Sequence, residues 1–142
     1  MTSQHRVLFD WVGTYPNIQK LFTFDFSKAK NNSQSFRLIA KDRVKRDILG
    51  NEIIDYIFSI GEYRHYTNDP FTMQNIENVE ALDDFIDWVN TQDKLRNYPQ
   101  IPNATVEKIR ADRTGSGVQS VDPIEGIALY SLTIVVTYTK EE

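Results

Sequence analysis

Hydrophobic positions follow the helical period most clearly between residues 75 and 97. They recur every three or four positions, at Ile76, Val79, Leu82, Phe85, Ile86 and Val89. This spacing predicts an amphipathic helix of about five turns, with one face built to cover a sheet. The polar positions expected on its opposite face are Glu77, Asn78, Glu80, Asp83, Asp84, Asp87 and Asn90. Pro99 and Pro102 then end the helix, because the residue before a proline is pushed out of helical geometry.

A shorter helical pattern spans residues 3–12. Its apolar stripe consists of Val7, Leu8, Trp11 and Val12. Ser3 stands where an N-cap is expected and Gly13 where a C-cap is expected. The chain therefore opens with a helix of two to three turns, which Pro16 prevents from continuing.

Two stretches alternate with the period of a strand. In residues 21–27, Phe22, Phe24 and Phe26 share one side and polar residues share the other. We interpret this phenylalanine face as core, with a subunit interface as the alternative. Residues 127–139 form the clearest strand of the chain. Its expected inner face consists of Ala128, Tyr130, Leu132, Ile134, Val136 and Tyr138.

A long hairpin is predicted in the first half of the chain. One arm runs over 36–47 and the other over 53–66, and the turn at 48–52 contains Gly50 and Asn51, which tolerate positive φ. The charged end of this hairpin, near 41–47, is expected to project beyond the core.

The second half of the chain adds a weaker strand pattern at 104–111. Residues 113–125 are rich in Gly, Ser and Asp and predict a flexible polar loop centred on Gly115, Ser116 and Gly117.

The predicted order is helix, three strands, helix, two strands. Strands that follow one another as hairpins indicate an α+β fold with a mainly antiparallel sheet of about five strands. The longer helix, 75–97, packs on one face of this sheet, and a β-hairpin protrudes. The 142 residues form a single domain, 1–142, since no linker or repeat interrupts them.

Composition narrows the class of protein. Hydrophobic residues make up 40% and charged residues 25%, which is typical of a globular chain. No apolar run approaches the roughly 20 residues that span a bilayer, and no apolar segment of a signal peptide opens the chain. With no cysteine, disulfides and thiolate metal sites are excluded, which suits a reducing cytosol. A net charge of −4 argues against specific nucleic-acid binding.

Candidate chemistry is sparse. Neither His5 nor His65 has a metal ligand at helical spacing, and no G-x-S-x-G nucleophile elbow occurs. The segment 114–117 resembles a phosphate loop but lacks the following lysine. We therefore expect no catalytic residues, no metal and no cofactor.

One basic concentration stands out at 41–46, with Lys41, Arg43, Lys45 and Arg46 against a single acid. These charges either guard a strand edge against unwanted pairing or dock on an acidic partner, with transient contact to nucleic acid as a further option.

Four features together resemble the tail terminator (tail completion) proteins of tailed bacteriophages, including relatives labelled minor capsid proteins in phages of Gram-positive bacteria. The first is the opening helix followed by the strand Phe22-Thr23-Phe24-Asp25-Phe26, and the second is the hairpin that runs through Ile48-Leu49-Gly50-Asn51 into Tyr56-Ile57-Phe58-Ser59-Ile60. The third is the helix with Leu82, Phe85, Ile86 and Trp88, which Pro99 and Pro102 follow. The fourth is the final strand from Tyr130 to Tyr138.

The resemblance implies a structural, non-enzymatic α+β subunit. Such subunits form a six-membered ring that caps the tail tube and faces the head connector, so the implied partners are further copies of the chain, the tail tube protein and the neck. The implied location is the virion, after assembly in the host cytoplasm. The residues expected at these contacts are Lys41, Arg43, Lys45, Arg46, Gly115, Ser116 and Gly117. The alternatives are another head–tail connector component, and a non-viral α+β adaptor or small-ligand-binding module.

Overall fold

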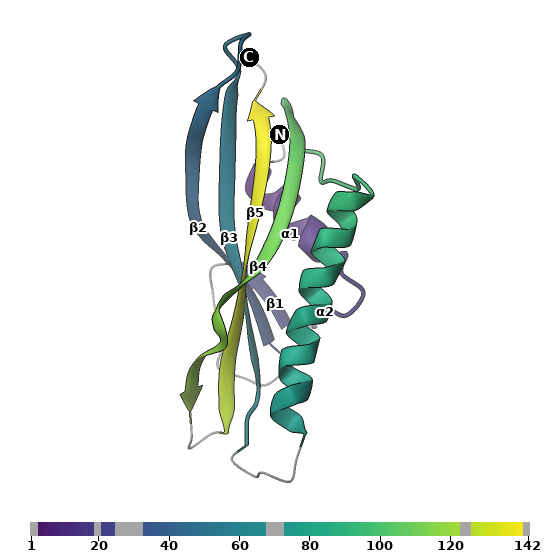
Figure 1. The fold of residues 1–142 in the computed structure, drawn as a ribbon, viewed down its shortest axis with the longest axis vertical. Coiled ribbons are helices and arrows are strands. Elements are labelled where there is room, and N and C mark those ends of the chain that lie inside the picture. The colour runs from purple at the N-terminus through teal and green to yellow at the C-terminus, as the bar shows by residue number, and fades with distance from the viewer. Residues whose placement is uncertain (1–2, 19–20, 25–32, 68–72, 123–125, 141–142) are drawn as a thin grey trace.

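The computed structural model describes residues 3–18, 21–24, 33–67, 73–122 and 126–140, and for 21, 42–44, 113–120 and 122 it describes the backbone alone. The elements are α1 (Gln4–Val12), β1 (Leu21–Phe24), β2 (Ser33–Arg46), β3 (Glu52–His65), α2 (Gln74–Lys94), β4 (Ala104–Asp122) and β5 (Ile127–Lys140). This is the predicted α+β class, with two helices and five strands (Figure 1).

The sheet is mixed but mainly antiparallel. Its strand order is β1-β2-β3-β5-β4, and only the short pair β1–β2 is parallel. β2 and β3 form the predicted hairpin, and β3 pairs with β5 from Glu52–Lys140 at one end to His65–Ile127 at the other. The strands of the hairpin therefore stay within the sheet, while its turn projects past both helices (Figure 1).

Both helices lie on one face of the sheet (Figure 1). The core between them contains Leu8, Trp11 and Val12 of α1, Leu82, Phe85 and Val89 of α2, and the alternate residues 54–60 of β3 and 128–138 of β5. The predicted inner face of the last strand is confirmed, because the residues of β5 with even numbers are buried beneath the helices.

Aromatic rings connect the layers of this core. Trp11 and Trp88 approach to 5.0 Å between ring centroids and join the two helices. Phe22 stacks on Phe9 of α1 at 4.4 Å, so this part of the phenylalanine strand belongs to the core. Phe24 packs beside it but stays 38% exposed, and Phe26 lies outside the described residues.

The buried face of α2 differs from the prediction. Ile76, expected inside, is 51% exposed, and Asn78, expected outside, is 1% exposed. Asn78 is buried because its amide finds partners on the sheet. It donates to the main-chain carbonyl of His65 at 2.6 Å and lies 3.2 Å from the Tyr130 hydroxyl. The helix also ends at Lys94 rather than at 97, since two residues later φ is +54°.

The predicted loop at 113–125 is wrong over most of its length. β4 continues through it to Asp122, and its residues pair with β5 up to Asp122–Ile127. Gly115, Ser116 and Gly117 lie in a bulge, because Arg113 faces Leu132 while Val118 already faces Tyr130. A long partner strand overrides local turn chemistry here, and residues 123–125 lie outside the described part. The first arm of the hairpin also begins earlier than the predicted 36, since β2 starts at Ser33.

Candidate functional site

The basic segment 41–46 forms the outer end of the hairpin. Lys41, Lys45 and Arg46 have exposed side chains, and Arg43 lies opposite Ile54 of β3. β1 pairs only with Ser33–Phe36 of β2, so the rest of β2 is the outermost strand at this end of the sheet (Figure 1). The charged strand residues stay within the sheet, because Lys41 and Arg43 lie opposite the buried Tyr56 and Ile54. The expected projection beyond the core therefore holds for the turn at 47–51 and not for 41–46.

The turn at the end of the hairpin, residues 47–51, is held by one aspartate. Asp47 Oδ1 accepts hydrogen bonds from the main-chain N–H groups of Leu49 and Asn51, both at 2.9 Å. The Asp47 main chain also bonds to Gly50 and Asn51 at 3.0 and 2.9 Å. Gly50 adopts φ +86°, which glycine reaches without steric cost. We call this turn the hairpin tip; hydrogen bonds within the turn hold its conformation.

Arg46 belongs to this framework. Its guanidinium donates to the Gly50 carbonyl at 3.0 Å and pairs with Glu52 at 3.3 Å. Exposed pairs of this kind stabilise a fold by only about 0–1 kcal/mol. Arg46 is therefore partly engaged within its own turn. The exposed side chains of Lys41 and Lys45 lie on opposite faces of the sheet, because Lys41 pairs with Tyr56 and Lys45 with Ile53.

The hairpin tip presents two large aliphatic side chains to solvent. Ile48 is fully exposed and Leu49 is 85% exposed. The sequence interpretation counted both only as turn residues and missed them as a site. The signal was present, since tight turns are dominated by Gly, Pro, Asn, Asp and Ser rather than by aliphatic residues.

The second predicted contact group lies elsewhere. Gly115, Ser116 and Gly117 are in β4, and β3 and β5 separate β4 from β2 in the sheet. The structure therefore does not bring the basic segment and the glycine segment together. They occupy opposite edges of one sheet.

Much of the β4 edge is already bonded to the segment that includes α2. The Asn90 side-chain oxygen accepts from the Ala111 N–H at 3.2 Å, and Asp93 Oδ1 accepts from the Ile109 N–H at 2.9 Å. The Tyr98 hydroxyl donates to the Glu107 carbonyl at 3.2 Å. This half of the edge cannot pair with a neighbouring strand without breaking these bonds.

The β2 edge is protected in a different way. Register shifts lie between Leu38 and Ala40 and between Arg43 and Lys45. Bulges and lysines are two devices by which proteins prevent edge-to-edge pairing of sheets. Neither sheet edge is thus a simple template for strand addition.

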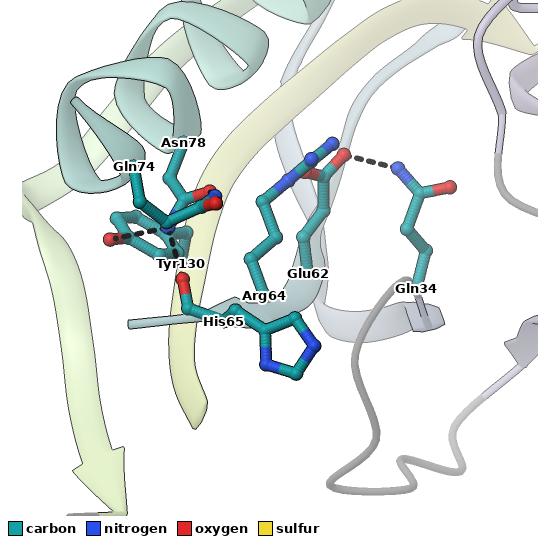
Figure 2. Close-up of polar contacts among 7 residues, drawn as sticks. All are labelled: Gln34, Glu62, Arg64, His65, Gln74, Asn78 and Tyr130. Carbon is teal, nitrogen blue, oxygen red and sulfur yellow. Dashed lines mark hydrogen bonds and ion pairs between the residues drawn. The ribbon is translucent and has the colours of Figure 1, made fainter. Parts of the chain in front are cut away.

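The interior holds a polar cluster (Figure 2). Glu62 is buried; its Oε2 pairs with Arg64 Nε at 2.8 Å and its Oε1 accepts from the Gln34 amide. Both carboxylate oxygens thus have partners within the subunit. Burial raises the pKa of the nearby Tyr15 hydroxyl, and the charge of Glu62 raises it further. Every buried side-chain nitrogen and oxygen of the described residues has a hydrogen-bond partner.

The histidines belong to no group of possible metal ligands in the described part of the chain. His5 Nδ1 lies 2.6 Å from the Tyr56 hydroxyl. The His65 ring is exposed and points away from Asn78 (Figure 2). Among the described residues, no three His, Asp or Glu side chains could hold a metal ion together.

Two of the hollows on the described surface are wide and open. One of about 450 Å³ lies beside α1 and is lined by His5, Arg6, Phe9 and Phe24 among others. The other, of about 580 Å³, lies on the face of the sheet that carries no helix, among charged residues such as Lys45, Asp55 and Lys108.

No protein-family model matches the chain, and no curated protein matches it. The phage resemblance therefore rests on the residue pattern alone. No helix in the described ranges is long and apolar enough to cross a membrane.

Proposed function

We propose that this chain is a structural subunit of a tailed bacteriophage. Six copies close into a ring at the end of the tail tube, and the ring joins the tail to the head connector. The observation that carries the proposal is the hairpin tip, where Ile48 and Leu49 stand exposed on a hydrogen-bonded turn.

Exposed aliphatic groups of this size favour a contact with protein. Burying an aliphatic side chain of this size stabilises by about 1.5–3 kcal/mol relative to leaving it in water. Association also costs entropy when loops must be ordered, and the bonds of Asp47 reduce this cost at the tip. The feature is thus suited to inserting into a partner surface.

The elongated shape also fits a ring. Closed rings use head-to-tail contacts, in which two different surfaces of the same subunit meet. The hairpin tip and the start of α2 lie at opposite ends of the molecule and differ in character (Figure 1). A net charge of −4 further suits a ring around a DNA passage, since such a protein does not grip the duplex.

The test is the native mass of the purified protein over a concentration series, with negative-stain images of the same samples. We expect a ring of six copies of the 16.5-kDa chain with a central hole. If the protein stays monomeric, the second measurement is binding to assembled tail tubes, on which the ring would then close. A monomer that binds no tail tube overturns the proposal and returns the chain to the class of adaptor or ligand-binding modules.

A further inference from the structure

We infer that the end of α2 and the segment after it take the place of a neighbouring strand along β4, and that this contact prevents β4 of one copy from pairing with β4 of a second copy. The inference goes beyond the proposed function, because every hydrogen bond that carries it lies within one subunit. It holds whether or not the subunits form a ring.

Two side chains of α2 bond to main-chain groups on the free edge of β4. Asn90 Oδ1 accepts from the Ala111 N–H at 3.2 Å, and Asp93 Oδ1 accepts from the Ile109 N–H at 2.9 Å. Asn90 and Asp93 are three positions apart and therefore lie on the same side of the helix, which runs beside β4 (Figure 1). The two amides belong to alternate residues, which is how the edge of an antiparallel strand presents the groups that a neighbouring strand would bond.

The segment after α2 extends this contact. The Tyr98 hydroxyl donates to the Glu107 carbonyl at 3.2 Å and lies 2.8 Å from Asp93 Oδ1. Positions 90, 93 and 98 therefore meet positions 111, 109 and 107, so that one segment ascends along the chain while the other descends. This is the order in which an antiparallel neighbour would meet β4.

The contact covers the most regular part of this edge. β4 pairs with β5 without a register shift from Lys108 to Arg113, which is its longest such stretch, and register shifts lie on both sides of it. Bulges hinder edge-to-edge pairing of sheets, whereas a regular edge is open to it. The side chains from α2 thus protect the part of β4 that bulges leave unprotected.

The partner that this contact excludes is a second copy of β4. In the described sheet β4 is the last strand, and the same edge recurs in every copy. Two such edges can pair antiparallel about a two-fold axis, because each then presents to the other the groups that it receives. Without the two acceptors on α2, the N–H groups of Ile109 and Ala111 would be open to this pairing.

Removal of both acceptors tests the inference. We expect Asn90→Ala with Asp93→Ala to speed hydrogen exchange of the Ile109 and Ala111 amides by about tenfold or more in dilute solution, because these amides lose their acceptors. At high concentration the exchange should slow again, and the native mass should rise above that of the wild type at the same concentration. Unchanged exchange in dilute solution, or a native mass equal to that of the wild type at every concentration, overturns the inference.

Two control variants separate the acceptors from the charge. Asp87→Ala with Thr91→Ala removes one acid and one uncharged polar side chain from the exposed side of α2, and should behave as the wild type. Asn90→Asp with Asp93→Asn keeps an acceptor oxygen at both positions and leaves the net charge unchanged, so β4 should stay covered. Association of either control as strong as that of the alanine pair overturns the inference.

A milder variant applies the same test if the alanine pair does not fold. Asn90→Ala alone should speed exchange at Ala111 and leave exchange at Ile109, which Asp93 still bonds, as in the wild type. Equal exchange at Ala111 in this variant and in the wild type overturns the inference. None of these measurements involves the tail tube or a ring, so their failure leaves the proposed function standing.

Discussion

Apolar side chains are usually buried and polar ones exposed, and the hairpin tip and the polar interior of the molecule depart from this rule in opposite ways. At the tip, Ile48 is apolar and fully exposed; in the interior, Asn78 is polar and buried. The buried Asn78 is satisfied within one chain, because its amide has hydrogen-bond partners on β3 and β5. The exposed Ile48 has no apolar partner at the tip of its own subunit. A buried polar group whose hydrogen bonds are all made contributes to the fold of the subunit. An exposed apolar group on a hydrogen-bonded turn favours a contact with another molecule.

The largest effect is expected for Asn78→Ala. This substitution removes the hydrogen bonds from the Asn78 amide to the His65 carbonyl and the Tyr130 hydroxyl. We expect the free energy of unfolding to fall by about 3 kcal/mol. Urea denaturation measures the change. Asn97→Ala, on an exposed residue, is the control and should lie within about 0.5 kcal/mol of the wild type. An equally small change for Asn78→Ala would show that the interior does not depend on this amide.

The next effect concerns Glu62→Gln. The amide can still accept from Gln34 but no longer balances the Arg64 guanidinium, so we expect a loss of about 2 kcal/mol. The same denaturation experiment applies. Glu80→Gln removes one exposed charge and should leave stability unchanged; a loss as large as that of Glu62→Gln would remove the distinction between interior and surface.

Sequence patterns predicted the parts of this fold that depend on local periodicity. The alternation of Tyr130, Leu132 and Ile134 identified the inner face of β5, and Gly50 marked the turn. The rotation of α2 could not be predicted, because the partners that hold Asn78 inside lie 13 and 52 residues away.

The bulge at Gly115 and Gly117 was missed for a similar reason. Local composition is that of a loop, and only the length of β5 on the other side shows that the segment pairs. For the candidate site, charge at 41–46 was readable from the sequence. The position of Ile48 and Leu49 in a predicted turn was also a readable signal, but the projection of this turn past the helices was not, since it depends on where the helices end.

At the tip, Asp47→Ala should have a smaller effect on folding. Two main-chain amides lose their acceptor at an exposed position, where water can replace it, and we expect about 1 kcal/mol or less. Self-association should weaken as well, because the two aliphatic side chains then sample many conformations. Light scattering and urea denaturation of the same sample measure both quantities. An unchanged association constant would mean that rigidity of the tip is irrelevant to the contact.

The smallest effect on stability is expected for Ile48→Ser with Leu49→Ser. Neither side chain is buried in the subunit, so the free energy of unfolding should change by less than about 0.5 kcal/mol. Self-association should fall nonetheless, which separates this pair from every interior substitution. A large loss of stability would contradict the contrast between tip and interior, since it would mean that both side chains stabilise the fold of the monomer.

The continuous pairing of β3 with β5 has a mechanical consequence. All fourteen residues of β3 are matched to β5, and the hydrogen bonds of an antiparallel ladder run perpendicular to the strands. A pull along the long axis, between the hairpin and the far end of the molecule, therefore loads these bonds in shear and all at once. The subunit resists stretching along the direction that joins its two ends, and tension applied at the turn is carried by a strand in the middle of the sheet.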